Sequence, residues 1–411
     1  MSLLTIGTVA FDALETPYGK TDKIIGGSCT YIALSSAFFL PKVNVVAVVG
    51  DDFPQAYMDT LTSKGIDLEG LQIKQGEKSF FWAGKYHNNM NSRDTLVTDL
   101  NVLADFKPVI PASYQDCDYL MLGNLTPQVQ IEAIEGLAKR PKLIVMDTMN
   151  FWMDVAMDDL KRVLKMVDVL CINDEEARQL SEQYSLRTAA KLIMAMGPKT
   201  LIIKKGEHGA LLFQDENMFY CPALPLEEVF DPTGAGDTFV GGFIGYLAKT
   251  DDISFENMRK AIVYGSAMAS FCVEKFGTER LLEIADTAKG QIVLEDMPTP
   301  VVDGHTARVR LLQHARFVGI AQTECIQGQR TLVRADVVQR VVQTVVLHHR
   351  QHRPEDFLLH DLHVIGHVQH QVRRYLARDR VIRRFVRRGQ ADNTRAFCSG
   401  IFQQANQALI V

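Results

Sequence analysis

The first 290 residues alternate short apolar runs with stretches of helical spacing, and this order predicts an α/β protein with a mainly parallel sheet. The run Val43–Val49 is apolar at nearly every position, which is typical of a strand buried on both faces. We expect strands at Leu3–Val9, Val43–Val49, Tyr119–Leu122, Leu143–Met146, Val167–Ile172 and Thr200–Ile203, and helices at Ser28–Leu40, Pro127–Ala138, Asp154–Met166 and Asp174–Ser185.

Residues 71–105 follow a different pattern. Pieces rich in β-forming residues, such as Ser79–Tyr86, are joined by short polar turns rather than by helical segments. We interpret this region as a small antiparallel excursion from the main sheet, and we expect it to form a lid. Residues 1–290 would then form one α/β domain with this lid.

The charge of the chain changes abruptly near residue 300. Residues 1–300 hold 27 Lys and Arg against 41 Asp and Glu, whereas residues 301–411 hold 17 Arg, no Lys and 8 acidic residues. Such a composition is expected when DNA is translated in an unselected frame, so we expect 299–411 to be a non-catalytic or spurious appendage. The alternative, a basic amphipathic helix that binds nucleic acid, stays open.

Composition excludes several other classes of protein. The chain is 47% hydrophobic and 23% charged, which is ordinary for a globular protein. No apolar run approaches the ~20 residues that a membrane span requires, and the N-terminus does not look like a secretory signal. The seven Cys have no paired spacing, which favours a reducing compartment. We therefore expect a soluble cytoplasmic protein.

The most informative segment is Asp231–Phe243, in which a Gly-Ala-Gly turn leads directly into an apolar helical stretch. Small residues allow close approach of an anion, and the free N–H groups and dipole of a helix start attract phosphate. Asp237 lies in that first turn, where a carboxylate could accept a proton from a substrate hydroxyl. A shorter match would equally be a helix cap, but thirteen residues favour the catalytic interpretation.

These thirteen residues closely resemble the C-terminal signature of the ribokinase-like (PfkB) carbohydrate kinase family. Four further segments resemble family motifs in the same order, and the resemblance covers about residues 1–285. The segments are the pair Gly26-Gly27, the stretch Val48–Phe53, the Asn-x-x-Glu motif Asn173–Glu176 and the glycine loop Lys205–Gly209.

The resemblance implies a ribokinase-like fold and ATP-dependent phosphorylation of a hydroxyl group. Asp237 would be the catalytic base, and Gly234, Ala235 and Gly236 would form an anion hole. Mg²⁺ would be organised through water, and a monovalent cation would lie near Asp231. By position, Lys205, Gly206, Gly209 and Thr233 would bind the nucleotide, and Asn173 and Glu176 would hold the Mg²⁺ waters. Taken alone, such an Asn–Glu pair also fits a helix cap.

The residues that would bind the acceptor are less well marked. The resemblance places Asp12, Gly26 and Gly27 beside the substrate, although Asp12 also fits an ordinary turn. The family commonly has Asn at the position of Tyr31, so this position does not support ribose-type recognition. Two more candidates, each equally compatible with a structural role, are Arg93 in the lid and Asn124 after an apolar strand.

The sequence therefore predicts an ATP-dependent kinase of a sugar or related small molecule. The alternatives are a nucleoside acceptor, a noncatalytic sensor, and a nucleic-acid-binding protein that uses the Arg-rich segment. The intact Asp237 and its glycine turn argue against the sensor. A homodimer formed through the lid is the expected assembly, and no membrane partner is expected.

Overall fold

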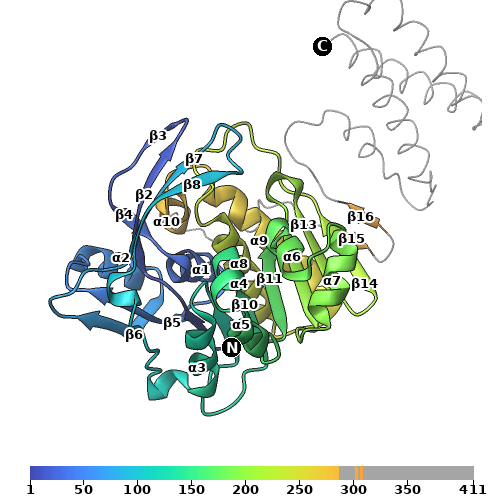
Figure 1. Ribbon diagram of the computed structural model, residues 1–411, viewed down its shortest axis with the longest axis horizontal. Helices are drawn as coiled ribbons and strands as arrows, with labels where there is room; N and C mark the ends of the chain where they lie inside the picture. Colours follow the sequence, from blue (N-terminus) through green and yellow to red (C-terminus); the bar gives the residue numbers. More distant parts are fainter. Residues whose placement is uncertain (287–300, 304–305, 309–411) are drawn as a thin grey trace, which may run out of the picture. The chain divides into compact units, whose positions relative to one another are not determined.

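The computed structural model describes residues 1–286, 301–303 and 306–308, and the predicted appendage at 299–411 lies almost wholly outside them. A nine-stranded sheet forms the centre of the body (Figure 1). Its strands, in spatial order, are β14 (Asn217–Cys221), β13 (Ala210–Gln214), β12 (Thr200–Lys204), β11 (Val169–Asn173), β10 (Leu143–Asp147), β9 (Tyr119–Leu122), β1 (Leu3–Ile6), β5 (Val43–Gly50) and β6 (Ile66–Lys74).

The strands from β12 to β6 are all parallel, and only the hairpins at β13 and β14 are antiparallel. Successive residues of the central strands enter two separate hydrophobic cores. Leu3 and Val45 pack on one face, whereas Leu4 and Val46 pack on the other. Continuous apolar runs in the sequence therefore reflect strands that are covered by helices on both sides.

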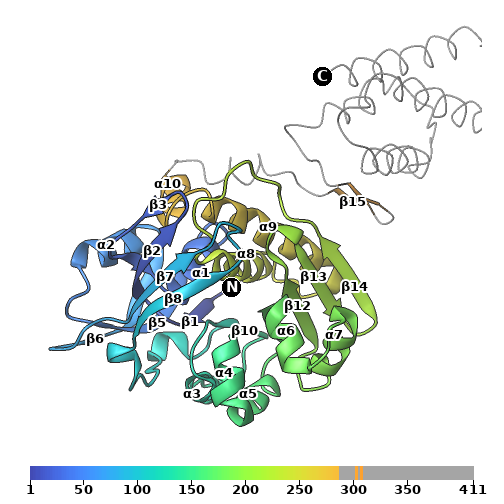
Figure 2. The same cartoon turned by 45° about the horizontal axis from the view of Figure 1, so that its top comes forward.

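Helices cover both faces of this sheet, as Figure 2 shows. The first face carries α1 (Ser28–Ser36), α8 (Ala235–Thr250), α9 (Phe255–Cys272) and part of α10 (Glu279–Asp286). The second carries α3 (Pro127–Glu135), α5 (Met157–Leu164), α6 (Asp174–Ser181) and α7 (Leu186–Met194). The remaining helices are α2 (Gln55–Ser63), α4 (Asn150–Val155) and the 3₁₀ turns Asn101–Leu103, Ala112–Tyr114 and Gly206–His208.

A second, smaller sheet contains the predicted lid but has different limits. Its strands are β3 (Gly19–Lys20), β2 (Ala10–Thr16), β7 (Phe81–Tyr86) and β8 (Arg93–Asp99), with β4 (Ile24–Gly26) paired to β2. Residues 71–74 of the predicted segment belong instead to β6 of the main sheet. The strand predicted at Leu3–Val9 ends at Ile6, because the chain then leaves the main sheet to form β2. The lid sheet is thus mixed, since β2 and β7 run parallel.

The helix predicted at Asp154–Met166 is two helices, α4 and α5, which meet at Ala156 with a non-helical φ of −142°. Beyond the body, β15 (Val301–Asp303) and β16 (Thr306–Arg308) pair as a short antiparallel hairpin. Of the helices that the structure describes, none is long and apolar enough to cross a membrane.

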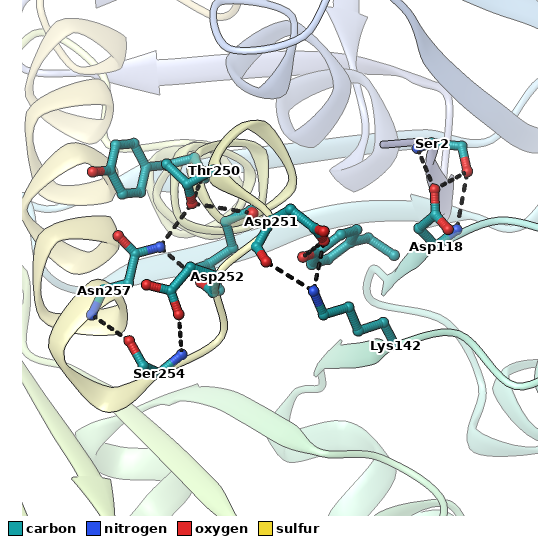
Figure 3. A network of polar contacts seen from close by, with 11 residues as sticks. Ser2, Asp118, Lys142, Thr250, Asp251, Asp252, Ser254 and Asn257 are labelled. Atoms are coloured by element: carbon teal, nitrogen blue, oxygen red, sulfur yellow. Dashed lines mark hydrogen bonds and ion pairs between the residues drawn. The ribbon is translucent and has the colours of Figure 1, made fainter.

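Helix α8 runs antiparallel to the parallel strands of the main sheet, from the edge at which these strands end to the edge at which they begin. Its last turn lies at the edge where the parallel strands begin, and a network of polar contacts holds it there (Figure 3). Lys142, just before β10, donates to the Asp251 carboxylate at 2.6 Å and to its carbonyl at 2.8 Å. Tyr119 donates to the same carboxylate at 3.0 Å. The first turn of α8 is therefore directed to the opposite edge, where the strands end.

Candidate active site

The Gly-Ala-Gly turn is the start of α8. Gly234 is the N-cap residue, with φ 73° and ψ 1° in the left-handed region that favours glycine. A β-carbon at this position would also lie 2.5 Å from the ring of Tyr31, which is fully buried beneath the turn. Gly234 is thus required both by its backbone conformation and by the packing of Tyr31. The turn presents the first N–H groups of α8 at the strand ends, as the sequence predicts.

Asp237 lies one turn into this helix, with its side chain partly buried. Removal from water and the nearby Asp147 carboxylate raise the pKa of Asp237 to about 7, and Lys204 and Arg93 act in the opposite direction. A carboxyl group that titrates near neutrality is well matched to general base chemistry at physiological pH. The structure therefore places Asp237 in the first turn of α8, with a pKa raised towards neutrality.

Lys204 is a charged residue of the site that the sequence analysis does not single out. It is the last residue of β12, and its Nζ lies 3.3 Å from Oδ2 of Asp147 at the end of β10. A β-carbon placed on Gly236 would lie 3.0 Å from that Nζ. The ammonium group is therefore next to the glycine turn, although it is contributed by a strand 32 residues earlier in the chain.

Asp147 is fixed by its own surroundings. Its Oδ1 accepts a hydrogen bond from the Thr148 N–H at 2.9 Å. The fully buried Gln130 donates to the carbonyls of Asp147 and Gly123, at 3.0 and 2.9 Å, and so ties the ends of β9 and β10 together. The carboxylate that pairs with Lys204 is consequently held on a rigid part of the sheet.

Asn173 and Glu176 form a capping box at the start of α6. The Glu176 N–H donates to Oδ1 of Asn173 at 2.8 Å, and the Asn173 N–H donates to Oε2 of Glu176 at 2.7 Å. Burial, followed by the charge of Asp147, raises the pKa of Glu176 to about 7. The helix-cap role is therefore real, and the same carboxylate also belongs to the acidic cluster beside Lys204.

These residues fit a hydrated Mg²⁺ better than a directly coordinated metal. Among the described residues, no group of three or more His, Cys, Asp or Glu side chains is arranged to hold an ion. The oxygen atoms of Glu176 and Asn173 suit a hard cation that keeps most of its waters. The charge of Asp147 opposes the ionisation of the buried Glu176 carboxyl group, and a nearby cation would relieve that repulsion.

The loop Lys205–Gly209 follows Lys204 directly. The Lys205 N–H donates to the Gly209 carbonyl at 2.8 Å, which closes a tight turn around Gly206–His208. Gly209, with φ 81°, leaves room for the Cys221 carbonyl, which a β-carbon would approach to 2.0 Å. The glycine loop and the Gly234–Gly236 turn therefore both lie next to the end of β12.

The smaller sheet, which contains the predicted lid, is joined to this site by Tyr86 and Arg93. Thr233, the residue before the glycine turn, donates its hydroxyl hydrogen to the Tyr86 Oη at 3.1 Å. Arg93, at the start of β8, faces Tyr86 across the hairpin and lies 5.6 Å from the Trp82 ring. Its charge lowers the pKa values of both Asp237 and Glu176. Arg93 is thus near enough to influence the acidic cluster.

Asp12 lies on β2, in the smaller sheet. Its side chain is buried, and a β-carbon on Gly26 would lie 1.9 Å from Oδ2 of Asp12. Burial, Asp231 and Asp237 raise the pKa of Asp12 to about 7. The two glycines allow this close packing, because Gly27 adopts φ 91° and a β-carbon there would meet the Thr8 carbonyl at 2.4 Å. Gly26 therefore packs against Asp12, and a role of these residues in binding the acceptor stays a prediction.

Two other candidates have clear structural partners. Oδ1 of Asn124 accepts a hydrogen bond from the Trp152 indole at 2.8 Å, and its amide contacts the Met149 sulfur at 3.0 Å. The Asp231 carboxylate accepts from the N–H groups of Thr233 at 2.9 Å and Gly277 at 2.8 Å, which shapes the turn before α8. Neither set of contacts could be predicted from the sequence, because the partners are distant in the chain or come from the backbone.

The comparisons with known proteins agree with this geometry. A family profile, pfkB family carbohydrate kinase, matches residues 17–285. The chain belongs to the pfkB family. Members of this family are ATP-dependent kinases, and the chain is accordingly an ATP-dependent sugar or nucleoside kinase.

Two curated relatives of this pfkB kinase match over most of their length. The cytidine kinase of Thermococcus kodakarensis is 31% identical over 251 residues, which cover 60% of this chain and 88% of that enzyme. The nucleoside kinase of Methanothermobacter thermautotrophicus is 26% identical over 307 residues, covering 70% of this chain and 93% of that enzyme.

A solved structure confirms the predicted ribokinase-like fold. The crystal structure of Methanocaldococcus jannaschii nucleoside kinase, an archaeal member of the ribokinase family, superposes with a TM-score of 0.56 and 18% identity. The likeness covers 69% of this chain and 99% of the archaeal protein. At this level of identity the similarity establishes the fold alone.

Proposed function

We propose that this pfkB kinase transfers the γ-phosphoryl group of ATP to a hydroxyl of a nucleoside or sugar, with Asp237 as the catalytic base. The observation that carries the proposal is the Asp237 carboxyl group, whose pKa is raised to about 7, in the first turn of a helix that begins with Gly234–Gly236. A helix start attracts phosphate, and a carboxylate beside it can accept the proton of an attacking hydroxyl.

In the proposed reaction, Asp237 takes the proton of the acceptor hydroxyl as its oxygen forms a bond to the γ-phosphorus. The bond between the γ-phosphorus and the bridging oxygen breaks, and ADP leaves. The backbone N–H groups of Gly234, Ala235 and Gly236 would stabilise the charge on the transferring group. Since this chemistry needs positioning more than covalent help, residues on rigid elements suit it.

Around the nucleotide, Lys205, Gly206, Gly209 and Thr233 are the proposed contacts. Asn173 and Glu176 would hold Mg²⁺ through water, and a monovalent cation would lie near Asp231. Bound Mg²⁺ would supply positive charge to the phosphate oxygens. The acceptor would lie between the lid and α8, beside Asp12, Gly26, Gly27, Arg93 and Asn124.

We propose a nucleoside as the first acceptor to test, because both relatives described above carry names of nucleoside-type kinases. Consumption of ATP should be measured against cytidine, other nucleosides, free ribose and other sugars. A preference for free sugars by at least tenfold in kcat/KM would replace the nucleoside by a sugar. No turnover with any member of either class would contradict the proposed function itself.

The test of the base is Asp237→Asn. This change keeps the size of the side chain but removes its ability to accept a proton, so kcat should fall by roughly 10²–10⁴-fold. The affinity for ATP, measured by calorimetry, should stay within a few-fold, since the backbone turn remains. A kcat within a few-fold of the parent protein would exclude Asp237 as the base.

The same helix offers a matched control, Asp251→Asn, at its far end. Asp251 adopts φ 52°, a conformation that Asn tolerates well, and its partners are Lys142 and Tyr119 rather than any residue of the site. We expect Asp251→Asn to leave kcat unchanged. An equal loss in both variants would mean that α8 responds to any change of charge.

Three further predictions from the sequence remain proposals. A homodimer formed through the lid is supported by the exposed Leu96 and Val97 of β8. A cytoplasmic location is supported by the free cysteines, which include the buried Cys29 and Cys171. Residues 299–411 are proposed to be non-catalytic or spurious, with nucleic-acid binding as the alternative.

A further inference from the structure

Lys204 occupies an unusual position for a lysine. Its side chain is only 16% exposed, and it extends from the end of β12 into the cluster formed by Asp147, Glu176 and Asp237. These carboxylates outweigh the effect of burial and raise the pKa of Lys204 above its usual value. The residue is therefore a permanent cation at neutral pH, and it cannot serve as a proton acceptor.

The contact that Lys204 makes with Asp147 does not use the full capacity of its ammonium group. The Nζ–Oδ2 distance of 3.3 Å is long for a charge-assisted hydrogen bond, which is usually about 2.7–2.9 Å. An ammonium group has three donors. Among the described residues, Asp147 is the only carboxylate within ion-pair distance of Lys204. The remaining donors are therefore available to another anion.

The position of Lys204 indicates which anion that would be. Its side chain lies along Gly236, where a β-carbon would come within 3.0 Å of Nζ, 3.6 Å of Cε and 3.8 Å of Cδ. The ammonium is thus beside the helix start that attracts phosphate, and close enough to the Asp237 carboxylate for its charge to oppose the rise in the pKa of that group. Glycine at position 236 leaves this approach open.

We infer that Lys204 is a second catalytic residue, which binds the oxygens of the transferring phosphoryl group from the β12 side while the α8 backbone binds them from the other. The inference rests on the proposed function. Lys204 stays protonated throughout: it forms hydrogen bonds to the phosphoryl oxygens, and the proton of the acceptor still goes to Asp237. Asp147 holds the lysine in place before and after transfer.

The test is Lys204→Met, which keeps most of the apolar stem and removes the charge. Removing one preorganised donor to a developing negative charge typically lowers kcat by about 10²–10³-fold. We expect a loss in this range, with the affinity for ATP changed by less than about fivefold because the effect is specific to the transition state. Lys204→Arg should recover part of the lost kcat. Lys199→Met, at the exposed residue just before β12, should leave kcat unchanged.

The pH dependence of kcat distinguishes the binding of phosphoryl oxygens by Lys204 from a simpler role, in which Lys204 only favours the ionised form of Asp237. If Lys204 acted only by favouring the ionised form of Asp237, its loss would raise the pKa of Asp237, and kcat would recover at high pH. Under our inference, Lys204→Met stays at least about 100-fold below the parent protein at pH 9. Recovery to within a few-fold at pH 9 would overturn the inference.

A double variant tests whether the loss of kcat in Lys204→Met comes only from the Asp147 charge that this change leaves unpaired. Lys204→Met with Asp147→Asn removes both members of the pair, and circular dichroism and thermal unfolding check that it folds. Recovery of kcat in this variant would overturn the inference, whereas continued loss supports it. These outcomes are distinct from failure of the proposed function, in which the parent protein phosphorylates no acceptor or Asp237→Asn keeps its activity.

Discussion

The two ends of α8 hold acidic residues in opposite electrostatic states. Beside its first turn, burial and the charges of neighbouring carboxylates, among them Asp231 and Asp147, raise the pKa values of Asp12, Glu176 and Asp237 to about 7. At the far end of the helix, hydrogen bonds from Lys142 and Tyr119 lower the pKa of Asp251, and those from the Ser254 N–H and hydroxyl lower that of Asp252 (Figure 3).

This difference supports the edge at the first turn of α8 as the proposed site of the chemistry. Buried carboxyl groups with raised pKa values reduce the stability of the folded state at neutral pH, and such groups cluster at functional sites. Paired, exposed carboxylates instead anchor the helix at modest energetic gain. One helix thus joins the proposed reactive edge to an edge where the carboxylates are paired and exposed. Variants that act on one end alone test whether the two ends differ in this way.

The largest effect should come from Gly234→Ala. Alanine at φ 73° costs about 1–2 kcal/mol, and its β-carbon would also lie 2.5 Å from the buried Tyr31 ring. Either the ring or the turn must move, so we expect a loss of kcat of at least about 100-fold, as for a lost anion-hole donor. In urea unfolding, the loss in the free energy of unfolding should exceed the about 1–2 kcal/mol that the strained backbone conformation alone costs.

Gly76→Ala is the matched control for this variant. Gly76 has nearly the same φ, 75°, but a β-carbon there would meet nothing within 4 Å. Gly76→Ala should therefore lower the free energy of unfolding only by the cost of the backbone conformation and leave kcat unchanged. If the two variants lose equal free energy of unfolding, Tyr31 adapts without strain and the packing argument fails.

The motif around Gly234 and Asp237 could be predicted because its residues are contiguous, and a glycine turn before an apolar helix has one dominant meaning. Lys204 could not be singled out in this way. It ends an apolar strand as an ordinary polar residue would, and its partner Asp147 lies 57 residues earlier in the sequence. The signal that could have found it is a lysine directly before a glycine loop and at the end of a strand of the parallel sheet.

The smaller sheet, which contains the predicted lid, shows the same limit of prediction from sequence: contacts between distant segments are not visible in it. Its β7 and β8 hairpin could be recognised from polar turns between β-forming pieces, whereas β2 pairs with β7 across some 70 residues of sequence. Asn124 is a further case, since an amide after a strand looks the same whether it binds a ligand or holds Trp152. Local patterns predicted the elements, and long-range pairing decided what the side chains contact.

The carboxyl groups near the first turn of α8 should have a moderate effect on how the free energy of unfolding depends on pH. For the three carboxyl groups near the first turn, the folded pKa of about 7 exceeds the unfolded value near 4, so the folded state binds more protons between these pH values. The free energy of unfolding should therefore fall as the pH rises from about 4 to about 7. Urea unfolding at several pH values would measure this slope.

Asp237→Asn should make that slope shallower, because one of the three groups no longer titrates. Asp251→Asn should leave it unchanged, since the pKa of Asp251 is lowered and its contribution is lost only as the pH falls below about 4. If the parent protein and Asp237→Asn have the same slope, the Asp237 carboxyl group titrates near its ordinary pKa. Asp237, the most important residue of the comparison, would then not differ from Asp251 in the direction of its pKa shift as described above.

The smallest effect should follow from Lys142→Met at the structural edge. Lys142 contacts both the carboxylate and the carbonyl of Asp251, but the pair is exposed, and exposed pairs contribute little and are screened by salt. Tyr119 still donates to the Asp251 carboxylate at 3.0 Å in this variant. We expect the midpoint of thermal unfolding to fall slightly at low salt and the difference to shrink as salt is added, with kcat and KM unchanged. A marked loss of kcat in Lys142→Met would mean that the far end of α8 positions Asp237, and that the two edges act as one unit.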